Sequence, residues 1–175
     1  RGRADEKLVL LDESEVELSE DVLAICDSQG PVAIAGIMGG LDSGVTSETR
    51  DILFESAYFN PATIMGKARA YGMHTDASHR FERGVDPQGQ VAAVERATAL
   101  LMEIAGGEPG PVLLAEDPDH VPRNQAVSLR PDRLRKVIGC DIPNDTVEGI
   151  LQRLGMDVIW QGDHWQVTAP SARFD

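Results

Sequence analysis

The segment GMHTDASHRFERGVD (72–86) gathers two histidines, two arginines and three acidic residues within fifteen positions. Side chains of these types can bind a metal ion, act in nucleophilic catalysis, contact nucleic acid, or hold a loop rigid through their own charges. His74 and His79 are five residues apart, so they do not share a helix face as an i, i+4 pair would, and no cysteine is near. Ser78 precedes His79 without the sharp GxSxG-type turn of a nucleophilic serine. The spacing therefore favours neither a zinc site nor a catalytic triad.

Two further features could form a ligand site. The segment GIMGGLDSG (36–44) has four glycines in nine positions, which allow either a tight turn or a close approach of the backbone to a ligand. It lacks the GK[ST] ending of a phosphate-binding loop. Glu55 lies in the apolar run DILFESAYF (51–59). A carboxylate there must face solvent, pair with a cation such as Arg80 or Arg83, or accept a hydrogen bond from a ligand. The sequence leaves these three possibilities open.

The elements that must position these residues are short strands and proline-started helices. Alternating or continuous apolar residues predict strands near 8–10, 16–18, 22–27, 31–37, 51–59 and 110–117. Asn60-Pro61 and Asp86-Pro87 are typical helix starts and predict helices over about 61–71 and 87–105. The strand over 31–37 is almost entirely apolar, which predicts a central, buried position.

A polar stretch with two prolines, 118–125, indicates a linker to a second unit. There the pattern predicts a strand in AVSLR, helices over about 131–138 and 144–154, and a hairpin of MDVIWQ and HWQVTAP around Gly162-Asp163. We expect an α+β protein: a first domain over 1–117, with a mixed sheet and flanking helices, and a small helix-helix-hairpin domain over 126–175.

Composition limits the possible partners. The net charge is −13, so the overall field of the protein does not attract nucleic acid, and any such contact must be local. A cluster of Arg130, Arg133, Arg135 and Lys136 could make phosphate contacts, although a solvated helix face is the simpler interpretation. No apolar run approaches the roughly 20 residues that span a bilayer, so we expect no membrane partner. Cys26 and Cys140 lie beside apolar residues, which suggests reduced, buried thiols in a cytoplasmic protein.

The run from Pro31 to Gly110 resembles the beta chain of bacterial phenylalanyl-tRNA synthetase. The matching segments are GIMGG, SGVT, ESAYFNP, KARAYGMHTDASHRFERGVDP and ERATALLMEIAGG. The segments LRPDRLRKVIG, ILQRLGMDV and WQVTAPSARFD look like the small domain that follows in the same chain. The resemblance implies the later part of an editing domain over 1–117, and a chain that begins RGRADEK and stops at PSARFD is interpreted as an internal fragment.

In that family the editing domain hydrolyses tyrosine wrongly attached to the phenylalanine tRNA. An apolar pocket made for phenylalanine rejects an added hydroxyl by only about 10²-fold, so a second site that hydrogen-bonds the hydroxyl is useful. The resemblance implies that Glu55 accepts this hydrogen bond and that Gly39, Thr75 and Ala77 line the pocket. No catalytic protein group is expected, because an oriented water and the terminal hydroxyl of the tRNA can hydrolyse a labile ester.

The remaining charged residues of the opening segment are expected to pin the loop and cap the next helix: His79, Arg80, Glu82, Arg83 and Asp86. The family also uses a histidine from a segment before residue 1, so the isolated chain is expected to edit poorly. In the family, Asp175 matches the first of a set of carboxylates that bind magnesium, and the other carboxylates lie further along the parent chain. The resemblance also implies a DNA-binding-like small domain at the C-terminus, and the sequence leaves open whether its basic residues contact nucleic acid or only face solvent.

The resemblance further implies a parent enzyme that uses ATP and magnesium to join phenylalanine to tRNA(Phe). Its partners would be tRNA(Phe) and an alpha subunit, in a heterotetramer of two alpha and two beta chains. A non-catalytic scaffold that holds the alpha subunit and tRNA is the alternative, and a stand-alone nucleic-acid binder is disfavoured by the charge of −13. Convergence of Glu55, Gly39, Thr75 and Ala77 on one concave site would separate editing from a scaffold.

Overall fold

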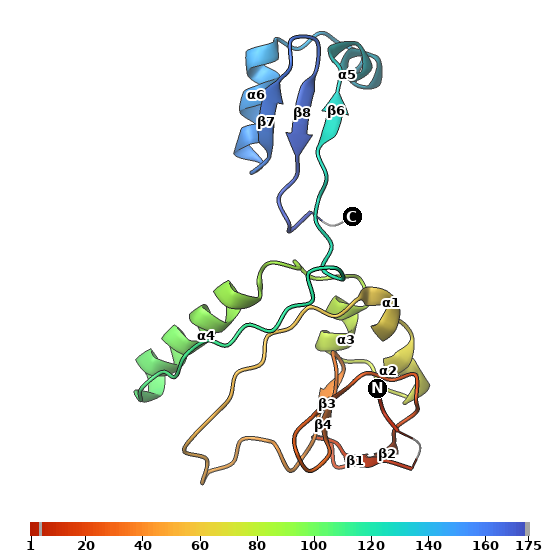
Figure 1. Cartoon of the computed structure of the whole chain (residues 1–175), viewed down its shortest axis with the longest axis vertical. Helices are drawn as coiled ribbons and strands as arrows, with labels where there is room; N and C mark the ends of the chain where they lie inside the picture. Colours follow the sequence, from red (N-terminus) through yellow and green to blue (C-terminus); the bar gives the residue numbers. More distant parts are fainter. Residues whose placement is uncertain (4, 174–175) are drawn as a thin grey trace. The chain divides into compact units, whose positions relative to one another are not determined.

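The computed structural model of the chain describes residues 1–3 and 5–173. They divide into two compact units, the first made of 1–85 and 90–112, the second of 86–89 and the chain from 113 onward (Figure 1). Each unit combines helices with small sheets, so the predicted α+β class is confirmed. No helix among the described residues is long and apolar enough to cross a membrane.

The first unit contains two small antiparallel sheets rather than the single mixed sheet that we expected. Strands β1 (Lys7–Val9) and β2 (Glu15–Glu17) form a hairpin, and β3 (Ala24–Cys26), β4 (Pro31–Ile34) and β5 (Met38–Gly39) form a second sheet in the order β3-β4-β5. Turns of a few residues join consecutive strands, and such short connections allow only antiparallel pairing. The predicted central position of the 31–37 strand is confirmed for β4, but only Ile34 of its four residues is buried.

The two sheets are joined edge to edge at strand β5. Leu10 and Gly40 form an isolated antiparallel bridge, and the backbone N–H of Leu11 donates to the carbonyl of Gly39 at 3.0 Å. The core of the unit lies between these strands and the helices that follow. It consists of buried Leu8, Leu10, Leu18, Val22, Ile34, Ile37, Ile64 and Ala68.

The helices of the first unit are shorter than the sequence predicted. The expected 61–71 helix is divided into α1 (Pro61–Ile64) and α2 (Lys67–Ala70), because Gly66 between them adopts a left-handed conformation with φ of +77°. A third helix, α3 (Asp76–Phe81), occupies a segment that we had predicted as a loop. The longest helix, α4 (Gln90–Ala105), begins after the Asp86-Pro87 turn rather than at Pro87.

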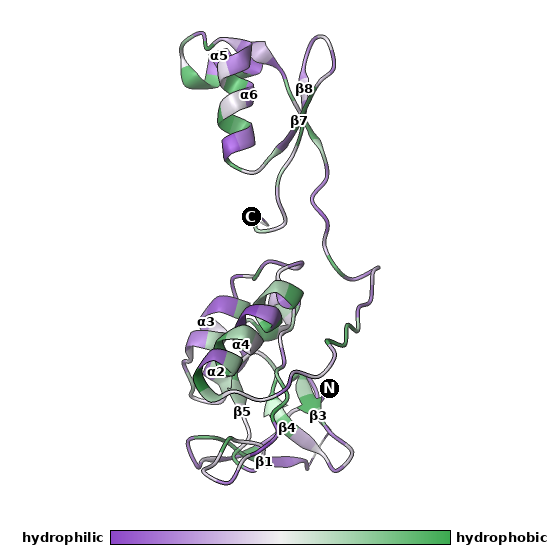
Figure 2. Cartoon of the chain, turned by 90° about the vertical axis from the view of Figure 1, so that its left-hand side faces the viewer, coloured by the Kyte–Doolittle hydropathy of each residue, from purple (hydrophilic) through white to green (hydrophobic). Residues whose placement is uncertain are grey.

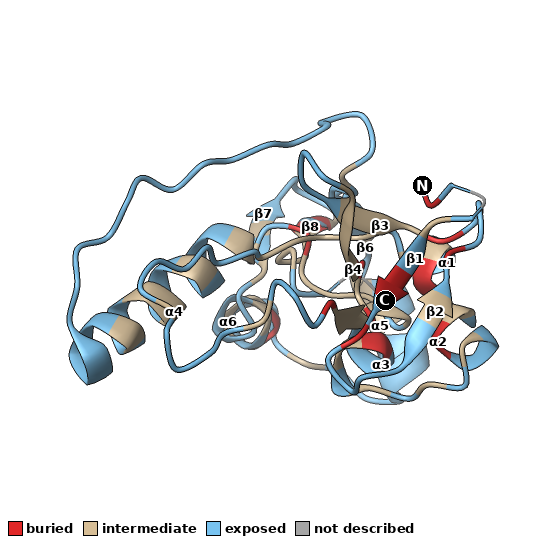
Figure 3. Cartoon of the chain, turned by 90° about the horizontal axis from the view of Figure 1, so that it is seen from below, coloured by how far each residue is buried: buried red, intermediate tan, exposed pale blue. Residues whose placement is uncertain are grey.

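Helix α4 has no buried residue. Figure 3 shows its ribbon only in the intermediate and exposed colours, and Figure 2 shows hydrophobic residues along it. Ile104 is 81% exposed. Within the described part of the chain, helix α4 therefore leaves apolar surface uncovered.

Two predicted strands are absent. Residues 51–59 and 110–117 contain no strand, and Leu53 and Leu113 are 93% and 87% exposed. A strand needs a neighbour that satisfies its backbone N–H and C=O groups, and no described segment pairs with either run. The burial expected for the cysteines is also wrong: Cys26 and Cys140 are free and exposed. Cys26 ends strand β3 at the edge of its sheet, where little of the core reaches it.

The second unit follows the predicted order. It contains β6 (Val127–Leu129), α5 (Pro131–Ile138), α6 (Asn144–Arg153), β7 (Asp157–Trp160) and β8 (Trp165–Thr168), with the antiparallel sheet order β6-β8-β7. Its core is built on Val147, Trp165 and Val167. Trp165 is fully buried, and its indole N–H donates to Oε1 of Glu148 at 2.9 Å.

Candidate functional site

The glycine turn is the connection between β4 and β5. Gly36 has φ of +68°, and a Cβ added there would lie 3.2 Å from Phe81 and 3.3 Å from Phe59. The rings of Phe59 and Phe81 lie 5.1 Å apart, so the turn packs against an aromatic pair that joins the end of segment 51–59 to α3. Only glycine fits Gly36, because the position combines a left-handed backbone with this close contact.

Thr75 caps helix α3 and also reaches the glycine turn. Its Oγ1 accepts a hydrogen bond from the N–H of Ser78 at 3.0 Å, while Ser78 Oγ accepts from the N–H of Thr75 at 3.1 Å, which completes a capping box. The Thr75 hydroxyl also donates to the carbonyl of Ile37 at 2.9 Å. This bond fixes the start of α3 beside the turn that leads into strand β5, which contains Gly39.

Ala77 and Gly39 lie on these two linked elements. Ala77 is in the first turn of α3 and is half-buried. Gly39 is in strand β5 opposite Ala33, and a Cβ added to it would lie 3.3 Å from Cδ1 of Leu11. The structure therefore places Thr75, Ala77 and Gly39 on neighbouring elements of the first unit.

Glu55 lies in the segment 51–59, which forms neither helix nor strand. The residue is exposed, yet partial burial of its carboxyl among neighbouring atoms raises its pKa above the usual value. No hydrogen bond or ion pair joins Glu55 to another described residue, so the proposed pair with Arg80 or Arg83 does not form there. Its convergence with Gly39, Thr75 and Ala77 stays a prediction.

The charged residues of segment 72–86 make local contacts. Arg83 donates to the carbonyl of His79 at 2.9 Å, and Glu82 accepts from the N–H of Gly66 at 3.1 Å. The rings of His74 and His79 lie 6.1 Å apart, and both residues are exposed. These contacts support the structural role predicted for Glu82 and Arg83.

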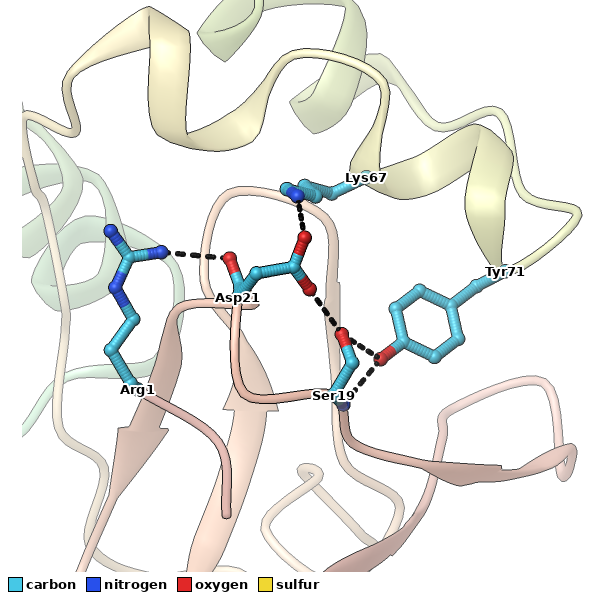
Figure 4. Close-up of polar contacts among 5 residues, drawn as sticks. All are labelled: Arg1, Ser19, Asp21, Lys67 and Tyr71. Carbon is cyan, nitrogen blue, oxygen red and sulfur yellow. Dashed lines mark hydrogen bonds and ion pairs between the residues drawn. The ribbon is translucent and has the colours of Figure 1, made fainter. Parts of the chain in front are cut away.

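A polar cluster that the sequence did not reveal lies beside α2. Lys67 forms an ion pair with Asp21, Ser19 donates from its N–H to the Tyr71 hydroxyl at 3.0 Å, and Arg1 donates to the Asp21 carbonyl at 2.7 Å (Figure 4). The hydrogen bonds from Lys67 and Ser19 lower the pKa of Asp21 to about 2. The partners are up to 52 residues apart, and no local pattern signals such a pairing.

A shallow hollow of about 360 Å³ adjoins this cluster. Its walls come from the end of β2, the turn that follows and helix α2, and they are Glu17, Ser19, Asp21, Val22, Met65, Gly66, Lys67, Ala70 and Tyr71. None of the residues expected to line an editing pocket is among them. The hollow is therefore separate from the site built on the glycine turn.

No group of three or more histidine, cysteine, aspartate or glutamate residues within the described ranges could hold a metal ion. Asp175, the residue expected to bind magnesium, lies outside the described residues. In the second unit Arg135 is paired with Asp132 at 2.7 Å and with Asp141 at 3.4 Å. These two aspartates neutralise part of the positive charge of the basic cluster over 130–136, which the sequence suggested for phosphate contacts.

Comparison with known proteins assigns both units. Residues 1–106 match the B3/4 domain family, and residues 127–175 match the tRNA synthetase B5 domain. A phenylalanine–tRNA ligase beta subunit of Idiomarina loihiensis is 55% identical over 99% of this chain and 22% of its own length. Beta subunits of the same description from Xanthomonas campestris and Yersinia pestis are 54% and 52% identical over 100% and 97% of this chain, and 22% and 21% of their own lengths.

The two matches define a protein that joins a B3/4 domain to a tRNA synthetase B5 domain. The chain belongs to the B3/4 domain family, and over its whole length it is similar to a section of phenylalanine–tRNA ligase beta subunits. It spans about a fifth of the length of the curated relatives that it matches.

Proposed function

We propose that this chain contributes to the hydrolysis of tyrosyl-tRNA(Phe) in a phenylalanine–tRNA ligase. The observation that carries the proposal is the Glu55 carboxylate, which has no partner among the described residues and a pKa raised by partial burial. A partly desolvated acceptor of this kind gains most from a hydroxyl donor. A tyrosyl group brings that donor and a phenylalanyl group does not, so the same side chain would select tyrosine.

The glycine turn and the start of α3 would form the wall for the aromatic ring. Gly39 carries no side chain, and Ala77 carries only a methyl group, so neither fills space that a ring needs. The Thr75–Ile37 hydrogen bond of 2.9 Å holds these two elements together. The chemical step needs only a water oriented on the ester carbonyl, with the terminal hydroxyl of the tRNA beside it.

The test is the Glu55→Ala variant of the full-length beta subunit, assembled with its alpha subunit. Loss of the proposed hydroxyl acceptor should lower the ratio of tyrosyl to phenylalanyl ester hydrolysis by about 10- to 100-fold. The measurement is deacylation of tRNA(Phe) charged separately with each amino acid. Glu48→Ala, which removes an exposed glutamate seven positions earlier, is the matched control. An unchanged ratio in Glu55→Ala would refute this role for the carboxylate.

The wider activity is part of the same proposal. The parent enzyme would join phenylalanine to tRNA(Phe) with ATP and magnesium, in a heterotetramer of two alpha and two beta subunits in the cytoplasm. The synthetic site would lie in the alpha subunit, so this chain would supply proofreading and scaffold.

The second candidate is a scaffold without editing activity. It is favoured by the apolar surface of the first unit and of the segment that follows, where Ile104, Leu113 and Leu114 are 81%, 87% and 68% exposed. Surfaces of this kind mark contacts with other protein. A beta subunit that keeps subunit assembly but shows no tyrosyl-tRNA hydrolysis above that of an enzyme lacking residues 1–112 would favour the scaffold.

A further inference from the structure

Ser78 is the one polar side chain among the buried residues that the structure describes, with 2% of its surface exposed. Its hydroxyl donates to the carbonyl of Thr75 at 2.9 Å and accepts from the N–H of Thr75 at 3.1 Å. The serine therefore holds both backbone polar groups of Thr75. These bonds fix the backbone of Thr75 and therefore the direction in which the Thr75 side chain points.

The Thr75 hydroxyl has a single proton, and that proton is donated to the carbonyl of Ile37 at 2.9 Å. The same oxygen accepts from the N–H of Ser78 at 3.0 Å. Thr75 consequently has no proton left to offer a substrate. Thr75 therefore acts on the site only by holding the turn between β4 and β5 in place.

A helix cap alone does not require this arrangement. The capping box is complete once Thr75 Oγ1 accepts from the N–H of Ser78 and Ser78 Oγ accepts from the N–H of Thr75. The bond to Ile37 is an addition that joins residues 38 positions apart. It links the start of α3, with Ala77, to the turn that leads into strand β5, which contains Gly39.

We propose that Ser78 is a positioning residue of the editing site. It orients Thr75 so that the threonine hydroxyl holds the Ile37 carbonyl, and this sets the spacing between Gly39 and Ala77 on the two walls. The inference rests on the proposed editing function. Displacement of one wall by a fraction of an ångström would misplace the ester relative to its water.

The experiment uses the complete enzyme and four variants: Ser78→Ala, Thr75→Val, Thr75→Ser and the double variant Thr75→Val/Ser78→Ala. Valine keeps the shape of threonine without its hydroxyl, whereas serine keeps the hydroxyl. The kcat and KM for hydrolysis of tyrosyl-tRNA(Phe) are measured at a temperature at which thermal unfolding curves show every variant folded. Ser128→Ala, on strand β6 of the other unit, is the control.

We expect Ser78→Ala and Thr75→Val each to lower kcat by about 10- to 100-fold. Thr75→Ser should stay within about twofold of the unmodified enzyme, because it retains both hydrogen bonds. The double variant should be no worse than the poorer single variant, since the two residues act as one unit. KM should change little, because neither hydroxyl is available to bind substrate.

Three results would overturn the positioning role: normal kcat in Ser78→Ala, losses that multiply in the double variant, or Thr75→Ser as poor as Thr75→Val. The Glu55→Ala variant in the same assay separates this inference from the proposed function. If Glu55→Ala loses selectivity while Ser78→Ala keeps full kcat, only the inference fails. If Glu55→Ala retains selectivity, the proposed function fails.

Discussion

The ammonium group of Lys67 is paired with the carboxylate of Asp21, which lies 46 residues earlier in the chain. The pair joins the first turn of α2 to the segment between β2 and β3. Hydrogen bonds from Lys67 and Ser19 lower the pKa of Asp21 from 3.8 to about 2. The ionised carboxylate is therefore the form that the folded first unit prefers.

This relationship predicts an acid dependence of stability. A group with a depressed folded-state pKa contributes stability above its unfolded pKa, and that stability is lost as the pH falls through the folded value. The contribution of Asp21 should therefore decline between pH 3.8 and about 2. Urea unfolding across this window should show a shallower acid loss for Asp21→Asn, with Glu20→Gln as the neighbouring control. Identical pH profiles for Asp21→Asn and the unmodified chain would contradict the prediction.

Gly36 and Gly72 give a matched pair of glycine substitutions. Both have a left-handed backbone, with φ of +68° and +70°, but a Cβ at Gly36 meets two aromatic rings whereas a Cβ at Gly72 meets no atom within 4 Å. Gly72→Ala should cost only the backbone strain, about 1–2 kcal/mol in the free energy of unfolding. Gly36→Ala should cost more, about 2–4 kcal/mol, because overpacking adds to the strain. Equal losses in chemical denaturation would show that the aromatic contact is unimportant.

The two tryptophans allow the second unit to be followed alone, because both lie on its hairpin. Their rings lie 5.0 Å apart, yet Trp165 is fully buried and Trp160 is 40% exposed. Trp165→Ala should destabilise this unit by about 3–5 kcal/mol, since it leaves a large cavity and an unpaired Glu148. Trp160→Ala should cost less than half as much. Both are measured from the fluorescence of the remaining tryptophan in urea, and a larger loss for Trp160→Ala would contradict the structure.

Cys26 and Cys140 are both exposed and free, so both thiols should react with a thiol-specific reagent in the native protein. The number of thiols that react per chain should be the same with and without denaturant. Cys26→Ser and Cys140→Ser should each remove one half of the reaction. A thiol that reacts only after unfolding would indicate burial at that position.

Helix α5 shows why some elements could be predicted closely from the sequence. Pro131 occupies its first turn, and Gly139 ends it with φ of +87°. Both signals are local, so the predicted bounds 131–138 are those observed. The helix expected over 61–71 contained an equally local signal at Gly66, which stops α1 and starts α2, but a lone glycine within a helical pattern is often tolerated.

The errors concern features that depend on distant partners. Apolar residues around Leu53 and Leu113 have the composition of strands, but the described residues offer them no neighbouring strand. The hydrogen bond from the Thr75 hydroxyl to the carbonyl of Ile37 was not predicted, and the position of Thr75 at a pocket stays a prediction. The site residues could be proposed from a family resemblance, whereas the hydrogen bonds that fix them required the fold.

The interruption at Gly66 has a further consequence. The N–H of Gly66 is taken by the carboxylate of Glu82, which lies just beyond α3. The chain changes direction there, so Ile64 before the bend enters the core while Lys67 and Tyr71 after it reach Ser19 and Asp21. A single glycine thus divides the segment 61–71 into a first part that holds Ile64 in the core and a second part that makes polar contacts.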